Sequence, residues 1–283
     1  MLIRCTAPDA LSNLVAVLEL AADGQVRCSV TTRRPSAATV KLVEDVLVAG
    51  DYYETGEPIA AFAWPLLIRA GGLARLTGTR LELSPRGRAT LAKPSYEALG
   101  TLWARWLGGV STDEMARIEA IKGQRRPGTL TSAVTRRAAV AVGLAALEPG
   151  SWTGVGKLLT ILRTQRPRLV AARNLRALWR LYLVDSYYGS LGHAGPRAWE
   201  VIEGRYALCV LLEYAATLGL IDVAYTDPRG ARDDYRTLWG ADELACLSRY
   251  DGLVAVRVNE LGAAILHDPG ALPGLALPVP RRP

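Results

Sequence analysis

The sequence contains few of the residues that enzymes and metal sites most often use. It has only two histidines and four cysteines in 283 residues. The cysteines are far apart, form no Cys-x-x-Cys pair and have no histidine within ligand spacing, so we expect buried thiols in a reducing compartment and no zinc site. These six residues are His193, His267, Cys5, Cys28, Cys209 and Cys246.

Catalytic motifs are also missing. No serine or cysteine lies in a Gly-x-Ser-x-Gly setting. The segment "GVGKLLT", residues 154–160, lacks the spacing of a phosphate-binding loop and follows no predicted strand. The acidic stretch "TDPRGARDDYR", residues 226–236, mixes both charges in a turn-rich region, where carboxylates are poorly fixed for a metal. We therefore predict a protein that is not an enzyme and has no cofactor.

Long apolar runs are absent as well. No run approaches the roughly 18 residues that a spanning helix needs, and the longest candidate, residues 138–147, is followed by Glu148-Pro149-Gly150. The opening "MLIRCTAPDA" has no signal-peptide core. We expect a cytoplasmic protein without membrane contact.

Positive charge is concentrated in the middle of the chain. The net charge is +7, and half of the residues are hydrophobic, which is enough for ordinary buried cores. Residues 121–180 contain 12 lysines and arginines against a single acidic residue, Glu148, whereas the flanks are neutral or slightly acidic. A segregated basic segment is typical of proteins that bind polyanions.

Several motifs occur twice in the same order. "LSPRGRATL", residues 83–91, aligns with "VNELGAAIL", residues 258–266, and each places an N-cap residue before a short helix. "GLARL" at 72–76 aligns with "GLIDV" at 219–223. The Tyr-Tyr pairs at 52–53 and 187–188 each precede a tryptophan by 11 residues, and Arg-Pro precedes a predicted helix at 33–47 and at 165–181. The order indicates a tandem duplication.

Two hairpins are predicted at equivalent places in this repeat. Residues 72–83 form apolar runs around Thr77-Gly78-Thr79, and Ser84-Pro85 begins a helix. The second copy has about 28 additional residues, with an Asp251-Gly252 turn that predicts a longer hairpin over residues 246–258.

The predicted fold is mainly α with small β-hairpins (α+β). We expect a first domain at 1–92, a helical connector and linker at 93–129, a second domain at 130–268 and a Pro-rich tail at 269–283. "LELSPRGRATL" and "RVNELGAAIL" resemble the ends of winged-helix domains, and the chain as a whole resembles the tandem winged-helix proteins of bacteria. The resemblance implies helix-turn-helix units with wings.

The basic residues of the second copy fit this arrangement. A third helix over 168–184 would place Leu175, Leu178, Trp179 and Tyr182 on an apolar face and its arginines on a separate stripe. In a winged helix this is the helix that enters the major groove. The candidate nucleic-acid-binding residues are Lys157, Arg163, Arg166, Arg168, Arg173, Arg176, Arg180, Arg136 and Arg137, with Arg86 and Arg88 in the first copy.

The leading hypothesis is a non-catalytic nucleic-acid-binding protein, with double-stranded DNA as its partner. Two alternatives remain open. The arginines could form only a solvated face, or the chain could be an adaptor with little DNA affinity in a larger bacterial complex, as similar domains are in chromosome-organising or phage-defence complexes. In the adaptor reading, the hairpin at 246–258 would add a strand to a protein partner.

Overall fold

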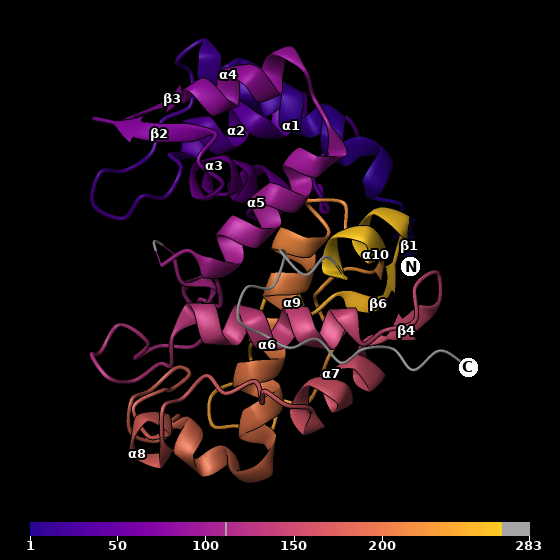
Figure 1. Ribbon diagram of the computed structural model, residues 1–283. Coiled ribbons are helices and arrows are strands. Elements are labelled where there is room, and N and C mark those ends of the chain that lie inside the picture. The colour runs from indigo at the N-terminus through magenta and orange to yellow at the C-terminus, as the bar shows by residue number, and fades with distance from the viewer. Residues whose placement is uncertain (111, 268–283) are drawn as a thin grey trace.

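The computed structural model describes residues 1–110 and 112–267, so the expected tail at 269–283 lies outside the described residues. The described residues form a mixed α and β structure with two small antiparallel sheets. Figure 1 shows the first four helices and their hairpin at one end of the molecule and β1 (Leu2–Arg4) beside the strands of the other half, with α5 (Tyr96–Gly108) running between the two halves. Among the described residues, no helix is both long and apolar enough to cross a membrane.

The first half consists of helices around a hairpin. Its elements are α1 (Ala7–Ala22), α2 (Ala37–Val46), α3 (Ala60–Ala70), β2 (Ala74–Thr77), β3 (Arg80–Leu83) and α4 (Pro85–Ala92). Thr77 lies opposite Arg80, so the expected hairpin turns at Gly78-Thr79. Gly78 has φ of 57°, a conformation that glycine adopts without steric cost.

The connector and second half follow a related order. In the connector, which was expected to be helical, α5 is followed only by a single 3₁₀ turn, η1 (Glu114–Arg117). After it come α6 (Ala133–Ala145), β4 (Trp152–Gly154), α7 (Val155–Thr164), α8 (Leu175–Leu178), η2 (Leu191–Arg197), η3 (Glu200–Gly204), α9 (Arg205–Cys209), η4 (Val210–Ala215), β5 (Ile221–Tyr225), β6 (Leu253–Val258) and α10 (Glu260–Leu266).

The larger sheet joins the two ends of the chain. Its strand order is β1-β5-β6-β4, and β1 (Leu2–Arg4) pairs antiparallel with β5. The hairpin expected over residues 246–258 is wrong: only its second arm is a strand, and this strand, β6, has neighbours on both sides. Asp251 in the turn is buried and accepts hydrogen bonds from the N–H groups of Leu247 and Ser248. The strand therefore has no open edge for a protein partner.

The last helix of each half is fixed by the same set of contacts. Ser84 caps α4 by accepting from the Gly87 N–H at 3.0 Å and donates to the Gly72 carbonyl at 2.8 Å. Asn259 caps α10 by accepting from the Gly262 N–H at 2.9 Å and donates to the Gly219 carbonyl at 2.9 Å.

The glycines of this arrangement are also equivalent. Gly72 and Gly219 have φ of 72° and 78°. A Cβ on Gly87 would lie 2.0 Å from the Leu73 carbonyl oxygen, and one on Gly262 would lie 1.8 Å from that of Leu220. The aligned residues of the two sequence segments thus make the same contacts.

The helix expected over residues 168–184 is wrong. Only Leu175–Leu178 is helical, and Leu175, expected in the core, is 69% exposed. The segments on either side form isolated bridges with residues 122, 130 and 190 instead of helical bonds. The Tyr-Tyr alignment also fails in three dimensions, because Tyr52 is buried whereas Tyr187 and Tyr188 are exposed.

The core position of a third helix is occupied by residues 200–215, in which α9 is flanked by the π-helical turns η3 and η4. Every residue from 201 to 225 is buried. This segment is mainly apolar, and its buried charged residues Glu203, Arg205 and Glu213 have hydrogen-bond partners, so it can lie in the interior of the protein. Its side chains belong to one hydrophobic core that also includes Trp64 and Trp106 from the preceding parts of the chain.

Substitution of Gly262 by alanine tests the shared helix-end arrangement. We expect Gly262→Ala to destabilise the protein by at least about 2 kcal/mol, because the new methyl group would overlap the Leu220 carbonyl. Gly156→Ala is the matched control, since a Cβ there meets nothing within 4 Å and alanine favours a helix. Urea denaturation measures both variants, and equal stabilities would contradict the close packing.

Candidate nucleic-acid interface

The third helix of each half is inaccessible to DNA. Residues 60–68 of α3 are buried, as are all residues of η3, α9 and η4 except Glu200, which is half-buried. The two helices contact each other through α3 and η4. A helix that reads the major groove must present a polar face to solvent. Neither helix presents one.

Arg136 and Arg137, expected to bind nucleic acid, are instead buried on α6. Arg136 donates to the Asp113 carboxylate, and Arg137 donates to both carboxylate oxygens of Glu114. The Tyr206 hydroxyl donates to the same Glu114 at 3.1 Å. Both guanidinium groups also donate to backbone carbonyls. The sequence predicted a charged surface here because nothing in it indicates that each arginine pairs with a carboxylate 23 residues earlier in the chain.

The other expected contacts divide into two sets. Arg163 is paired with Glu200. Five others are exposed but scattered. They lie on α7, on the loop that follows it and on α4: Lys157, Arg166, Arg168, Arg86 and Arg88. Figure 1 places α4 at the opposite end of the molecule from α8.

Six cationic residues gather where two distant segments meet, and we call this set the basic ridge. Five are exposed and Arg180 is half-buried. Within the part of the chain that the structure describes, none of the six forms an ion pair. The basic ridge consists of Lys122, Arg125, Arg126, Arg173, Arg176 and Arg180.

Backbone hydrogen bonds hold the two segments of the ridge together. The Lys122 N–H donates to the Tyr182 carbonyl at 2.7 Å, and the Arg173 N–H donates to the Thr129 carbonyl at 2.9 Å. The Arg180 side chain donates to the Pro127 carbonyl at 3.3 Å. Three ridge residues, Arg173, Arg176 and Arg180, were among those expected from the sequence. The other three lie in a segment that the sequence indicated as a linker, and its run of cations was the only signal.

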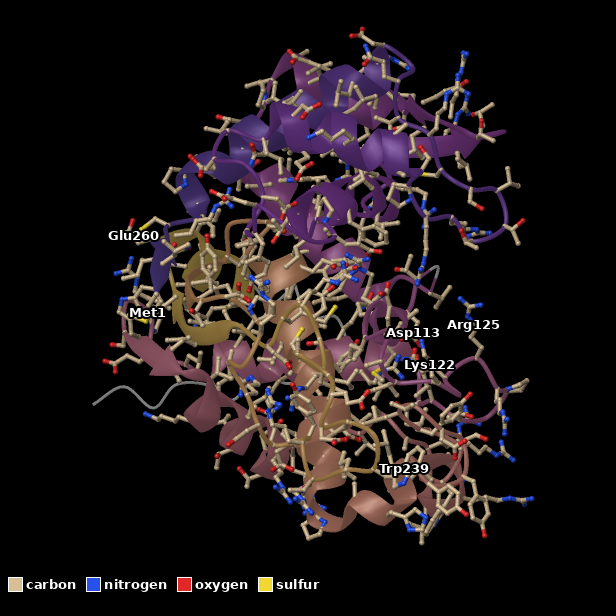
Figure 2. The ribbon with its side chains drawn as sticks, turned by 180° about the vertical axis from the view of Figure 1, so that it is seen from behind. Met1, Asp113, Lys122, Arg125, Trp239 and Glu260 are labelled. Carbon is tan, nitrogen blue, oxygen red and sulfur yellow. The ribbon has the colours of Figure 1, made fainter. Side chains whose placement is uncertain are left out.

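A groove of about 680 Å³ runs beside the basic ridge. Its lining includes Arg34 from the first half together with Lys122, Arg125 and Arg126, and Tyr182 contributes an aromatic surface. A smaller cavity of about 260 Å³ also has Arg34 and Arg125 in its lining. Figure 2 shows Lys122 and Arg125, which line this groove, close together on one side of the molecule. Cationic walls of this kind attract anions.

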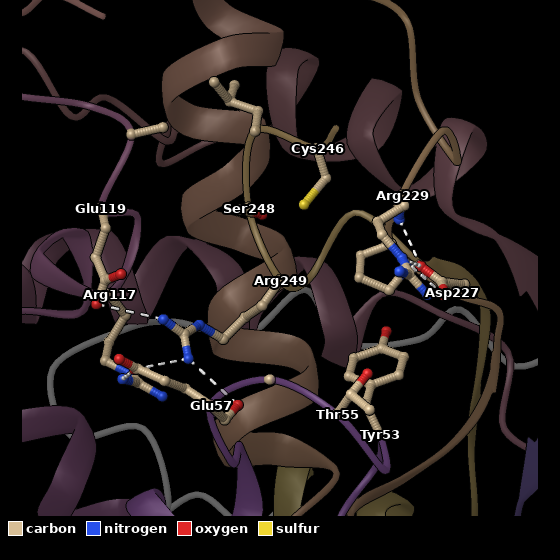
Figure 3. Close-up of a pocket in the computed structure, with 14 residues that line it drawn as sticks. Tyr53, Thr55, Glu57, Arg117, Glu119, Asp227, Arg229, Cys246, Ser248 and Arg249 are labelled. Atoms are coloured by element: carbon tan, nitrogen blue, oxygen red, sulfur yellow. Dashed lines mark hydrogen bonds and ion pairs between the residues drawn. The ribbon is translucent and has the colours of Figure 1, made fainter. Parts of the chain in front are cut away.

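A second pocket, of about 430 Å³, lies between the halves and has a different character (Figure 3). Its charges are internally paired: Arg249 contacts Glu57 at 2.8 Å and Glu119 at 3.3 Å, and Arg229 binds Asp227. Pairing leaves no free cation for an anionic ligand. These ion pairs instead connect the segments that form the pocket walls.

The chemistry of this second pocket is that of a structural junction. Burial, aided by the nearby Asp251 carboxylate, raises the pKa of the Cys246 thiol, which disfavours the reactive thiolate. No histidine is among the residues that line it. Across the described ranges, no three His, Cys, Asp or Glu side chains are grouped so as to hold a metal ion.

Glu203 anchors the segment that enters the basic ridge. Its carboxylate accepts a hydrogen bond from the Ala171 N–H at 2.8 Å, and the side chain is buried. Burial raises the pKa of Glu203 from 4.5 to about 7, although the backbone hydrogen bonds and nearby Arg136 act in the opposite direction. A raised carboxyl pKa means that the folded protein favours the protonated form.

Glu203 therefore predicts a pH-dependent stability. The contribution of the protonated Glu203 to the free energy of unfolding is fully present below about pH 4.5 and is lost as pH rises through about 7. The total loss approaches about 3 kcal/mol. Glu203→Gln keeps an acceptor for the Ala171 N–H, so it should remove this pH dependence and be more stable than the native protein at pH 8. Urea denaturation between about pH 5 and 8 measures it, with exposed Glu243→Gln as control. Parallel profiles for all three proteins would show that Glu203 is ionised in the fold.

Comparison with known proteins identifies no relative. No family model, curated protein or solved structure matches this chain. Its function is accordingly inferred from the positions, exposure and charges of its own side chains.

Proposed function

We propose that the protein is a non-catalytic nucleic-acid-binding protein built from two winged-helix-like domains in tandem, and that the basic ridge is its contact surface. The shared N-cap contacts of Ser84 and Asn259 support the tandem arrangement. So does the order of elements at the end of each half, where a buried helical segment is followed by two antiparallel strands and a last helix.

The observation that carries the proposal is the gathering of six cations without ion pairs at one place. Five come from exposed positions on loops or the short α8, where no internal acidic partner is needed for folding. Holding like charges together costs free energy through mutual repulsion, and a polyanion offsets that cost. Each phosphate that such a surface neutralises releases counterions, which gives affinity that does not depend on the base sequence of the nucleic acid.

Contact through the ridge differs from the binding mode that the sequence indicated. Both third helices are buried, so neither of these two described helices presents a groove-reading face. Binding through the ridge would depend on the phosphate backbone, so it should discriminate little between sequences.

A second candidate is an adaptor with little nucleic-acid affinity. The observation that favours it is the mutual burial of the two third helices, because this arrangement leaves the two halves as one rigid unit rather than two DNA readers. Such an adaptor would use a surface other than β6, whose edges are both paired.

Substitution within the ridge tests the proposal. Arg125→Gln/Arg126→Gln/Arg176→Gln removes three cations from both ridge segments. The control Arg80→Gln/Arg86→Gln/Lys157→Gln removes three exposed cations elsewhere. We expect the ridge variant to lose at least tenfold in affinity and its salt slope to fall by about 2 to 3, since each phosphate contact contributes about 0.9. The control should bind within about threefold of the native protein.

The measurement is fluorescence anisotropy with a labelled duplex and a labelled single strand, from about 50 to about 200 mM salt. Loss of affinity for either probe in the ridge variant alone supports the proposal. Equal losses in both variants would show that only net charge matters. Absence of binding to both probes by the native protein would overturn the proposal in favour of the adaptor.

A further inference from the structure

Three aromatic side chains form an exposed cluster beyond one end of the basic ridge. Tyr187, Tyr188 and Trp239 are 76%, 61% and 52% exposed. The ring centroids of Tyr187 and Tyr188 are 5.1 Å apart, and those of Tyr188 and Trp239 are 5.5 Å apart. Large rings are usually buried, so a contiguous group of them in water indicates a binding surface. We call these three residues the aromatic cluster.

The loop that carries two of these rings is held in place. The Asp185 carboxylate accepts hydrogen bonds from the N–H groups of Tyr187 and Tyr188, both at 2.8 Å. The Gly189 N–H donates to the Asp185 carbonyl at 3.0 Å, which closes the turn. A ring presented on a fixed turn loses less entropy on binding than one on a mobile loop.

The aromatic cluster adjoins the ridge. Lys122 of the ridge forms a β-bridge with Tyr182. Val184 follows Tyr182 by two residues, about 7 Å in an extended chain, and lies against Gly240, the residue after Trp239. Figure 2 shows Lys122, Arg125 and Trp239 on the same side of the molecule.

The ridge segment also carries an exposed ring of its own. Trp179 is 44% exposed and stands immediately before Arg180 in the sequence. A Cβ on Gly192 would lie 2.2 Å from its ring, so a glycine allows the backbone to cover one part of the indole and leaves another open to solvent. One exposed ring therefore stands between the ridge cations Arg176 and Arg180 in the sequence.

We propose, resting on the nucleic-acid binding proposed above, that this surface takes single-stranded nucleic acid, with the phosphates on the basic ridge and unpaired bases stacked on the aromatic cluster. A duplex satisfies a phosphate-binding ridge equally well, but its bases are stacked on each other and present no free face. A single strand can offer both its charge and its base faces, which is the combination that stacking platforms beside cationic grooves recognise. The cations beside the rings favour this occupant over an apolar protein segment, because they would remain unpaired against such a partner.

The test compares an aromatic-to-alanine variant with its aromatic-conserving counterpart. The first is Tyr187→Ala/Tyr188→Ala/Trp239→Ala, and the second is Tyr187→Phe/Tyr188→Phe/Trp239→Phe, which keeps rings but removes hydroxyl and indole hydrogen-bonding groups. The probes are labelled oligothymidylate of about 20 nucleotides and a duplex of the same length. Anisotropy gives both affinities, and thermal melts followed by circular dichroism check that all three proteins fold alike.

The native protein should bind the single strand at least fivefold more tightly than the duplex at equal salt. The alanine variant should lose at least tenfold in single-strand affinity, with duplex affinity unchanged within twofold, and the phenylalanine variant should keep its single-strand affinity within threefold, because stacking needs only a ring. Equal affinity of the native protein for both probes, or no effect of the alanine changes, would overturn single-strand selection while leaving nucleic-acid binding intact. Failure of the native protein to bind either probe would overturn both.

Discussion

The carboxylate of Glu213 is buried where the two halves meet, and its neutralisation organises the segments around it. Arg117 donates to it at 2.9 Å, and the Tyr250 hydroxyl donates to the same carboxylate. The guanidinium also lies 3.6 Å from the Phe62 ring centroid on α3 and contacts Glu57. An unpaired charge at this depth would cost about 3 to 5 kcal/mol. Four parts of the chain thus depend on one ion pair for their relative positions.

The same junction determines which surfaces are left for binding. Because α3 and η4 are buried against each other around Glu213, the helices at the third position of each half serve as core. Ion pairs neutralise the pocket between the halves, whereas the cations of residues 122–126 and 173–180 form no ion pair with any described residue. The cations of the basic ridge therefore lie on loops and the short α8, near the exposed rings of the aromatic cluster.

Local sequence signals succeeded where a side chain and its own backbone decide the structure. Ser84 and Asn259 cap their helices as expected, and Gly78 turns the first hairpin. The helix expected over residues 168–184 failed, because bridges to residues 122 and 130 replaced its helical bonds while the more apolar residues 200–215 filled the core. The available signal was the long, mainly apolar segment at 201–225. Its few charged side chains, among them Glu203, Arg205 and Glu213, have partners inside the fold, so it buries more apolar surface than an arginine-rich helix would.

The sequence by itself determined the N-caps of α4 and α10, the repeated glycines, the first hairpin and the accumulation of positive charge in residues 121–180. Only the tertiary structure decided which of those charges face solvent. Arg136 and Arg137 lie in that same basic stretch, yet carboxylates from residues 113 and 114 draw them into the core. Lys122, Arg125 and Arg126 have no acidic partner among residues 1–110 and 112–267, and they lie at the surface with Arg173 and Arg176. The physical reason is that burial of a charge depends on a partner brought close by folding, and sequence spacing does not encode that distance.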